Sequence, residues 1–326
     1  MSVTSHSTPP RSQRQTRVIY LGGVGRSGSS LLARLLDAEP DTTAVGEVVR
    51  LWERGIADDE RCSCGRRFSE CDFWRRVGAA GFGGWERVDV DRVEHLRVQV
   101  GRLRHVPRLT APWQPRSRGG HGRLARAYAG YYARVYDAVR RVSGCRAVVD
   151  GSKNISLAAV LRLAPEVDLR VVHLVRDVPA VAYSWGKRVR RPETDGSTLM
   201  PTYLPTLVGL WWITENALFH ALGRRGVPVL RLRYEDLVAD PSGTLDAVRR
   251  FADLDEVPGY PFLDGRRARL GRGHTFGGNP MRFVSEPVEL GLDDAWRAEL
   301  GRRARWVVSA LGLPLRLGYG YLGRGR

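Results

Sequence analysis

Residues 17–37 read RVIYLGGVGRSGSSLLARLLD, and this stretch decides the fold class of the chain. It opens with a short apolar run that ends in Gly22, which is typical of a strand buried in a parallel sheet. Glycines dominate as far as Gly28, and the leucines that follow recur at helical spacing up to Asp37, with Pro40 just beyond. A strand, a glycine-rich loop and a helix in this order predict an α/β protein.

The same alternation continues along the chain. Strand patterns occupy residues 147–150, 169–175 and 227–232, and helix patterns occupy 155–163, 178–190, 206–224, 242–252 and 293–311. Alternating strands and helices predict a mostly parallel sheet with helices on both faces. We expect a single domain over residues 17–322.

Two segments depart from this pattern. Residues 1–16 are polar and lack an apolar core of signal-peptide length, so they are predicted to be a disordered tail. Residues 55–145 hold cysteines, a basic Pro/Gly stretch at 102–122 that reads as a surface loop, and a Tyr- and Arg-rich helix at 123–142. We interpret residues 55–145 as an insertion that covers the functional site.

The composition is that of a soluble globular protein with a strong positive charge. Lys+Arg is 52 and Asp+Glu is 35, a formal net charge of +17. Only Lys153 and Lys187 are lysines, so 52 − 2 = 50 residues are arginines. Arginine-rich codon usage explains this bias, and it is compatible with a surface that attracts anions. No apolar run reaches the roughly 18–20 residues that span a bilayer, so we expect a cytoplasmic protein with no integral membrane segment.

The loop from Gly23 to Ser30 has the spacing G-x-x-x-x-G of a phosphate-binding loop, in the strand-to-helix context that such a loop requires. Its backbone amides and the helix N-terminus can surround an anion. A nucleotide triphosphatase would have Lys after the second glycine, to bridge the phosphates of a metal-bound triphosphate. Here Ser29 takes that position and Arg26 lies inside the loop. The sequence therefore predicts anion binding without magnesium.

Four segments, in this order along the chain, resemble motifs of sulfotransferases that use 3′-phosphoadenosine 5′-phosphosulfate (PAPS). GVGRSGSSLLARLLDAEP at 23–40 resembles the 5′-phosphosulfate loop of the bacterial, carbohydrate and tyrosylprotein branches. HLVRDVPAVAYS at 173–184 is similar to the 3′-phosphate motif, RLRYEDLVADP at 231–241 to the R-Y-E-D-L segment, and GGNPMR at 277–282 to the G-N-P-x-R segment of bacterial members. The resemblance implies PAPS as co-substrate, 3′-phosphoadenosine 5′-phosphate (PAP) as product, and no required metal.

The resemblance also implies a donor site built from these motifs. Its residues would be Gly25, Arg26, Ser27, Gly28, Ser29, Ser30, Arg176, Ser184, Tyr234, Asn279 and Arg282. Arg176 and Ser184 would bind the 3′-phosphate, and a guanidinium at a strand end suits that role chemically. The alternatives are a surface Arg176 paired with Asp177, and a Tyr234 that only packs in the core.

Catalysis requires a base, because the acceptor hydroxyl must lose its proton as the new S–O bond forms. In tyrosylprotein and some bacterial sulfotransferases a glutamate in the segment that matches VGEVVR at 45–50 is the base, so the resemblance points to Glu47. The alternatives are that Glu47 only neutralises Arg50, and that His274 is the base.

The segment DGSKN at 150–154 matches the place where cytosolic sulfotransferases have a catalytic histidine, and it contains none. It contains Lys153, which by resemblance lies near the sulfuryl group. Lys153 and Arg26 would then stabilise the charge on the leaving phosphate.

Cys62, Cys64 and Cys71 have the spacing C-x-C-x6-C, which invites a zinc interpretation. Structural zinc sites usually have four ligands, and the sequence offers a fourth only in distant Cys145 or in a histidine. The sequence alone therefore favours a reduced cysteine turn that packs against neighbouring aromatic residues. Bacterial sulfotransferases often have a similar segment.

Together these features predict a sulfotransferase whose acceptor is a hydroxyl of a carbohydrate, glycolipid, secondary metabolite or peptide tyrosine. A P-loop kinase or NTPase is disfavoured by Ser29 and because Asp150 is the only candidate magnesium-binding acid at a strand end. A nucleic-acid-binding protein driven by charge is disfavoured because no basic helix with alternating aromatic residues is present. We expect acceptor specificity to lie in residues 55–145.

Overall fold

The computed structural model describes residues 15–110, 119–191 and 198–322. Most of the predicted tail therefore lies outside the described residues. Its last residue, Thr16, already belongs to strand β1 (Thr16–Gly22), and its amide donates to the carbonyl oxygen of Glu166 (2.8 Å), the residue just before the neighbouring strand.

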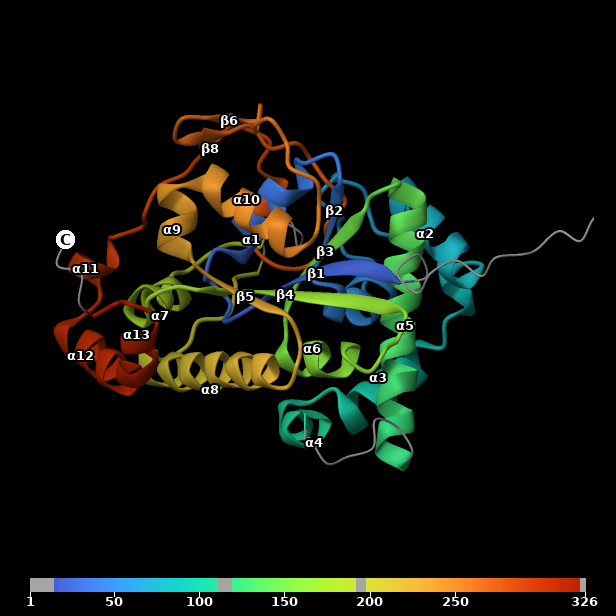
Figure 1. Cartoon of the computed structure of the whole chain (residues 1–326), viewed down its shortest axis with the longest axis horizontal. Helices are drawn as coiled ribbons and strands as arrows, with labels where there is room; N and C mark the ends of the chain where they lie inside the picture. The colour runs from blue at the N-terminus through green and yellow to red at the C-terminus, as the bar shows by residue number, and fades with distance from the viewer. Residues whose placement is uncertain (1–14, 111–118, 192–197, 323–326) are drawn as a thin grey trace, which may run out of the picture.

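A parallel five-stranded sheet with the order β2-β3-β1-β4-β5 forms the centre of the molecule (Figure 1). The other strands are β2 (Thr42–Gly46), β3 (Ala147–Lys153), β4 (Val167–Val175) and β5 (Val229–Arg233). The apolar runs of β1 and β4 become its buried middle, as a sheet covered on both faces requires. The predicted α/β fold with a mostly parallel sheet is confirmed.

Successive residues of β1 point into two different cores. Val18 and Tyr20 pack into one core with α5 (Gly120–Ser143), α6 (Ile155–Leu161) and α8 (Pro205–Arg224). Ile19 and Leu21 pack into the other with α1 (Ser29–Asp37), α9 (Tyr234–Ala239) and α10 (Pro241–Phe251). Helices therefore cover both faces of the sheet (Figure 1).

The chain between β2 and β3 contributes to the first of these cores. It forms η2 (Val48–Arg50), η3 (Leu51–Ala57), α2 (Asp72–Phe82), η4 (Trp85–Arg87), α3 (Val90–Val100), η5 (Leu103–His105), α4 (Val106–Thr110) and α5. The basic stretch 102–122 was predicted as a surface loop, and this is wrong for α4, where Val106 and Leu109 are buried. Residues 111–118 lie outside the described residues.

Two predicted helices differ most from the observed ones. The helix expected over 178–190 ends earlier, as α7 (Val178–Gly186), and the next residue, Lys187, has extended backbone. The helix expected over 293–311 is broken into α11 (Trp296–Glu299) and α12 (Arg302–Leu311), because Leu300 and Gly301 between them have extended backbone. A short helix, α13 (Leu313–Gly318), follows.

A small antiparallel sheet that the sequence patterns did not predict contributes Ala268 to the core that α1, α9 and α10 share. Its strands are β6 (Leu263–Asp264), β7 (Arg267–Ala268) and β8 (Val288–Glu289), and the 3-10 helix η7 (Pro280–Phe283) lies between β7 and β8 in the chain.

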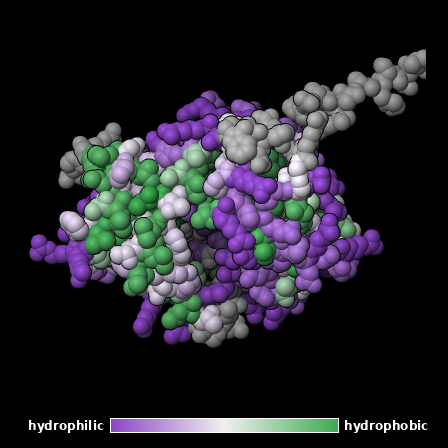
Figure 2. All heavy atoms as spheres, turned by 90° about the horizontal axis from the view of Figure 1, so that it is seen from below, coloured by the Kyte–Doolittle hydropathy of each residue, from purple (hydrophilic) through white to green (hydrophobic). Residues whose placement is uncertain are grey.

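The face below the sheet is hollowed near its centre, and apolar side chains gather on one side of the hollow (Figure 2). Exposed apolar residues of this side include Leu207, Leu210 and Trp211 on α8 and Trp306 on α12. Among the described residues, no helix combines the length and the apolar character that crossing a bilayer would require.

Candidate active site

The carboxyl ends of all five parallel strands meet at one cavity of about 570 Å³, the place where open α/β sheets bind ligands. The loop after β1, Glu47 after β2, Lys153 at the end of β3, Arg176 after β4 and Tyr234 after β5 all line it. Its volume lies within the roughly 300–1,000 Å³ usual for small-molecule sites.

The glycine-rich loop is packed too tightly for a side chain at Gly28. Gly28 caps the N-terminus of α1 with a φ of 90°, and a Cβ there would lie 2.3 Å from Cδ2 of Tyr234. Glycine is the residue that tolerates both conditions. Tyr234 therefore lies directly against the loop, and its hydroxyl donates to the carbonyl oxygen of Gly291 (3.2 Å).

Arg26 brings a partly buried cation to the loop. Its Nε and Nη2 atoms are buried and have no hydrogen-bond partner within the described residues. The guanidinium lies over the ring of Trp185, 5.0 Å from the centroid. Burial lowers the pKa of Arg26, and the charge of Glu47 opposes this shift. Buried donors without partners are costly, so this guanidinium fits an anion that the loop would hold.

Arg176 lies deep in the cavity wall and faces the same loop. Its guanidinium is 4.6 Å from the Tyr234 ring centroid, and Nη2 donates to the carbonyl oxygen of Asp293 (3.1 Å). The alternative partner, Asp177, is bound by Arg316 through two hydrogen bonds of 2.8 and 3.0 Å. Arg176 is therefore not paired with Asp177; its nearest carboxylate is that of Asp293, 3.9 Å from Nη2. Arg176 lines the cavity together with Ser184 of α7.

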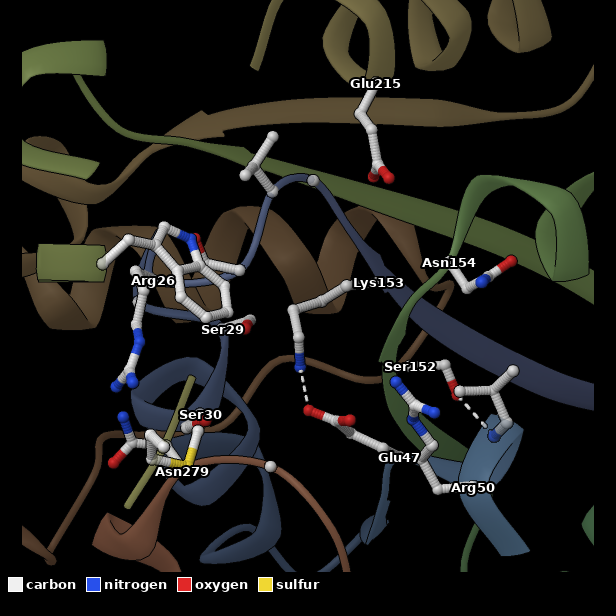
Figure 3. A pocket seen from close by; sticks show the side chains of 18 of the residues that line it. Arg26, Ser29, Ser30, Glu47, Arg50, Ser152, Lys153, Asn154, Glu215 and Asn279 are labelled. Carbon is white, nitrogen blue, oxygen red and sulfur yellow. Dashed lines mark hydrogen bonds and ion pairs between the residues drawn. The ribbon is translucent and has the colours of Figure 1, made fainter. Parts of the chain in front are cut away.

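Glu47 and Lys153 form an ion pair inside the cavity (Figure 3), with Nζ of Lys153 2.6 Å from Oε1 of Glu47. Nζ also donates to the carbonyl oxygen of Gly151 (2.7 Å). Burial alone would raise the pKa of Glu47, but Lys153, with Arg50 and Arg54, holds that pKa below its ordinary value. Glu47 is thus a carboxylate at neutral pH and can accept a proton.

A network of buried hydrogen bonds holds the backbone just after Glu47. Asp150 accepts hydrogen bonds from the Tyr136 hydroxyl (2.6 Å) and from the amide and hydroxyl of Ser152 (2.8 and 2.5 Å). The Ser152 hydroxyl in turn accepts from the amide of Val49 (2.9 Å). Burial raises the pKa of Asp150 to about 6. Asp150 is therefore a structural residue here, which weakens its candidacy as a magnesium ligand.

Two residues predicted for the donor site, and the alternative base, do not line this cavity. Ser27 is buried and is not among the cavity residues. Arg282 is bound to Glu60 (2.7 Å) and lines only a small recess that adjoins the cavity. His274 faces the cysteines, with Nδ1 3.3 Å from Sγ of Cys71, so the geometry favours Glu47 over His274 as the base. Asn279 does line the cavity.

The sequence patterns missed Glu215, which projects from α8 toward the cavity, opposite Lys153 (Figure 3). Burial raises the pKa of Glu215 to about 7, although Lys153 acts in the other direction. A signal was present, because Glu215 is the one charged residue between positions 205 and 222. An isolated charge in an otherwise apolar helix indicates a polar environment on one face.

Solved structures of low sequence identity resemble the chain. The sulfotransferase domain of the Synechococcus PCC 7002 olefin synthase is 19% identical, with a TM-score of 0.48, over 92% of this chain and 95% of that one. The sulfotransferase domain from the curacin biosynthetic pathway is 16% identical, with a TM-score of 0.45, over 91% and 98%. No curated protein sequence matches the chain significantly.

The family model described as "Sulfotransferase family" matches residues 19–258, a span that begins in β1 and includes the loop, Glu47, Lys153, Arg176 and Tyr234. Because this match covers well over half of the chain, the protein belongs to the sulfotransferase family.

Proposed function

We propose that this protein transfers the sulfuryl group of PAPS to an acceptor hydroxyl, with Glu47 as the general base. One observation carries the proposal. Arg26, whose Nε and Nη2 atoms are buried without a hydrogen-bond partner among the described residues, and the Glu47–Lys153 ion pair line the same cavity at the strand ends. A cation for the donor and a carboxylate for the acceptor proton therefore lie within one site.

The donor would extend along the loop. The amides of the loop and Arg26 would hold the 5′-phosphosulfate, as helix N-termini hold anions. Arg176 and Ser184 would hold the 3′-phosphate, and Tyr234, which packs against Gly28, would contact the nucleotide. We propose that this binding needs no magnesium, because Ser29 replaces the usual lysine and Asp150 is engaged by Tyr136 and Ser152.

The chemistry follows from the ion pair. The acceptor oxygen attacks sulfur in line and forms the new S–O bond, while its proton passes to the Glu47 carboxylate. The bond between sulfur and the bridging phosphate oxygen breaks, and that oxygen keeps the electron pair. Lys153, whose bond to Glu47 weakens once Glu47 is protonated, and Arg26 stabilise the new negative charge. Preorganised donors of this kind are typically worth about 3–4 kcal/mol each.

The acceptor would approach from the side of α8 and α3. Trp211 and Glu215 of α8 line this side, as do Arg97 and Gly101 from the segment 55–145. Their presence supports the proposal that residues 55–145 shape the acceptor site. A carbohydrate, glycolipid or secondary metabolite with a free hydroxyl would fit this mixture of aromatic and charged side chains.

Thermal-shift measurements test the choice of donor. PAP in the presence of EDTA should raise the melting temperature, since it binds only the folded protein. A shift that required Mg-ATP would favour a kinase or NTPase, and salt-sensitive binding of DNA or RNA would favour a nucleic-acid-binding protein. No response to PAP would contradict the proposed donor.

The variant Glu47→Gln tests the base. It keeps the shape of the side chain but removes the proton acceptor, so kcat should fall by about 10²–10⁴-fold. PAP affinity, measured by calorimetry, should change little. Wild-type turnover by Glu47→Gln with any acceptor would exclude Glu47 as the base.

A further inference from the structure

Four potential metal ligands meet outside the cavity. The Sγ atoms of Cys62, Cys64 and Cys71 and the Nδ1 atom of His274 all lie within 4.8 Å of one another. Sγ of Cys71 is 3.7 Å from Sγ of Cys64 and 3.8 Å from Sγ of Cys62. Nδ1 of His274 is 3.3 Å from Sγ of Cys71 and 3.9 Å from Sγ of Cys62.

These distances are those of a tetrahedral ligand shell. With zinc–sulfur bonds of about 2.3 Å, tetrahedral angles place sulfur atoms about 3.8 Å apart, and with zinc–nitrogen bonds of about 2.0 Å they place sulfur and nitrogen about 3.5 Å apart. The sulfur–sulfur distances agree with this expectation, and the two sulfur–nitrogen distances bracket it.

The backbone is arranged to present these ligands. Gly65, with a φ of 93°, closes a tight turn in which its amide donates to the carbonyl oxygen of Cys62 (2.9 Å). The ring of His274 stacks on Phe73, with centroids 4.8 Å apart and planes 9° apart. The indole of Trp74 donates to the carbonyl oxygen of His274 (2.8 Å). The orientation of the histidine is therefore set by the residues just after Cys71.

Thiol packing alone does not account for this arrangement. Cys62 and Cys71 are fully buried, and thiols are weak donors and acceptors that gain little from contact with one another. A disulfide would join two sulfur atoms and leave the third cysteine and His274 without a role. A metal ion uses all four groups, including a histidine 203 positions from Cys71.

We propose that Cys62, Cys64, Cys71 and His274 form a structural zinc site. Thiolate and imidazole ligands suit zinc and exclude magnesium and calcium, and four protein ligands leave no open position for substrate. None of the four residues lines the cavity.

The site would tie the cysteine turn to the chain that supports Glu47. The Ser63 amide donates to the carbonyl oxygen of Thr275 (2.8 Å), and the Ser63 hydroxyl accepts from the Thr275 amide (2.9 Å). The next residue, Phe276, accepts from the amide of Glu47 (3.1 Å). Zinc would therefore hold together two segments that are more than 200 residues apart. They meet next to Phe276, which binds the backbone of Glu47.

Metal analysis of the full-length protein, purified without a polyhistidine tag, tests the proposal. We expect equimolar zinc in the wild type, and thiolate-to-metal charge-transfer bands after replacement by cobalt(II). Cys64→Ser should lose the zinc, whereas Cys145→Ser, which changes the remaining buried free cysteine, should keep it. Zinc that survives Cys64→Ser would overturn the assignment.

A second measurement needs only the wild type, so it holds even if Cys64→Ser does not fold. A mercurial reagent that titrates the thiols should release zinc in proportion to the thiols modified. Protein produced with ample zinc that contains none, and that gives no cobalt bands, would overturn the proposal, as would a disulfide among these cysteines found by mass spectrometry. Both measurements are independent of PAPS and of turnover.

Discussion

At the scale of single residues, both cationic residues of the proposed reaction have a strained backbone conformation. Arg26 has a φ of 73° and Lys153 a φ of 61°, and among the described residues only Asp59 and Asp253 are further non-glycine residues with positive φ. Such conformations cost on the order of 1–3 kcal/mol each and persist where the surroundings enforce them. Here the strain directs both side chains into the cavity, where Lys153 meets Glu47.

Arg26→Gln tests the loop cation. Removing the charge should lower kcat by about 10²–10³-fold, the usual loss for one preorganised donor, and should weaken PAP binding about tenfold or more. Arg97→Gln is the matched control, because Arg97 lines the same cavity but is paired with Glu94 (2.6 Å). Equal losses of PAP affinity in the two variants would mean that the overall charge of the cavity, and not Arg26, holds the donor.

The raised pKa of Glu215 predicts that the stability of the folded protein depends on pH. Its folded-state pKa is raised to about 7, so the folded protein keeps a proton there that the unfolded chain releases near its ordinary, lower pKa. The free energy of unfolding should therefore fall as pH rises toward and through 7. Glu215→Gln has no such proton to lose. The free energy of unfolding of the variant minus that of the wild type should therefore rise by on the order of 3 kcal/mol between pH 4 and pH 8.

Denaturant unfolding at several pH values measures this difference. Glu53→Gln is the control for removing a carboxylate from the cavity, because Glu53 also lines the cavity but its side chain is 57% exposed. A constant difference between Glu215→Gln and the wild type would show that Glu215 is not desolvated.

At the scale of elements, the turn from β1 into α1 controls how closely Tyr234 approaches the donor loop. Gly28→Ala would place a Cβ 2.3 Å from the Tyr234 ring and force a φ of 90° on alanine. We expect a loss of more than about 1 kcal/mol of stability, and weaker PAP binding. Gly130→Ala, in the interior of α5 with open space around the new Cβ, should instead stabilise the protein by about 0.5–1 kcal/mol.

Denaturant midpoints and PAP calorimetry on both variants measure these effects. If Gly28→Ala binds PAP normally, the contact between the loop and Tyr234 is not needed for the donor site.

At the scale of the whole molecule, a buried arginine links two segments that lie far apart in the sequence. Arg249 of α10, with a side chain that is 2% exposed, pairs with Glu39 and with Asp41 (2.7 Å) in the connection between α1 and β2. Arg249→Ala would leave two acidic groups without their partner, so we expect a loss of about 3–5 kcal/mol in the free energy of unfolding.

Its neighbour Arg250 is exposed, and Arg250→Ala should change stability by no more than about 0.5 kcal/mol. Chemical denaturation of the two variants gives the comparison. Equal free energies of unfolding for the two variants would mean that the ion pairs of Arg249 contribute nothing to stability.

Local patterns in the sequence were enough to predict the parallel sheet and the glycine-rich loop between β1 and α1. The reason is that strand, loop and helix signals in residues 17–37 lie within a few residues of one another. The same patterns failed at Leu300 and Gly301, where two extended residues interrupt a helix, and in a basic stretch that has buried apolar residues, as at Val106 and Leu109.

Only the tertiary structure decided which distant side chains meet. Glu47 and Lys153 are 106 positions apart in the chain, and Cys71 and His274 are 203 apart. No periodicity spans such distances, because these contacts depend on how the strand ends and the turns around them pack. The sequence by itself therefore determined the place of the candidate site, a glycine-rich loop at the carboxyl edge of a parallel sheet. Packing determined which side chains meet. It paired Glu47 with Lys153, directed Glu215 toward the cavity, and brought His274 next to three cysteines.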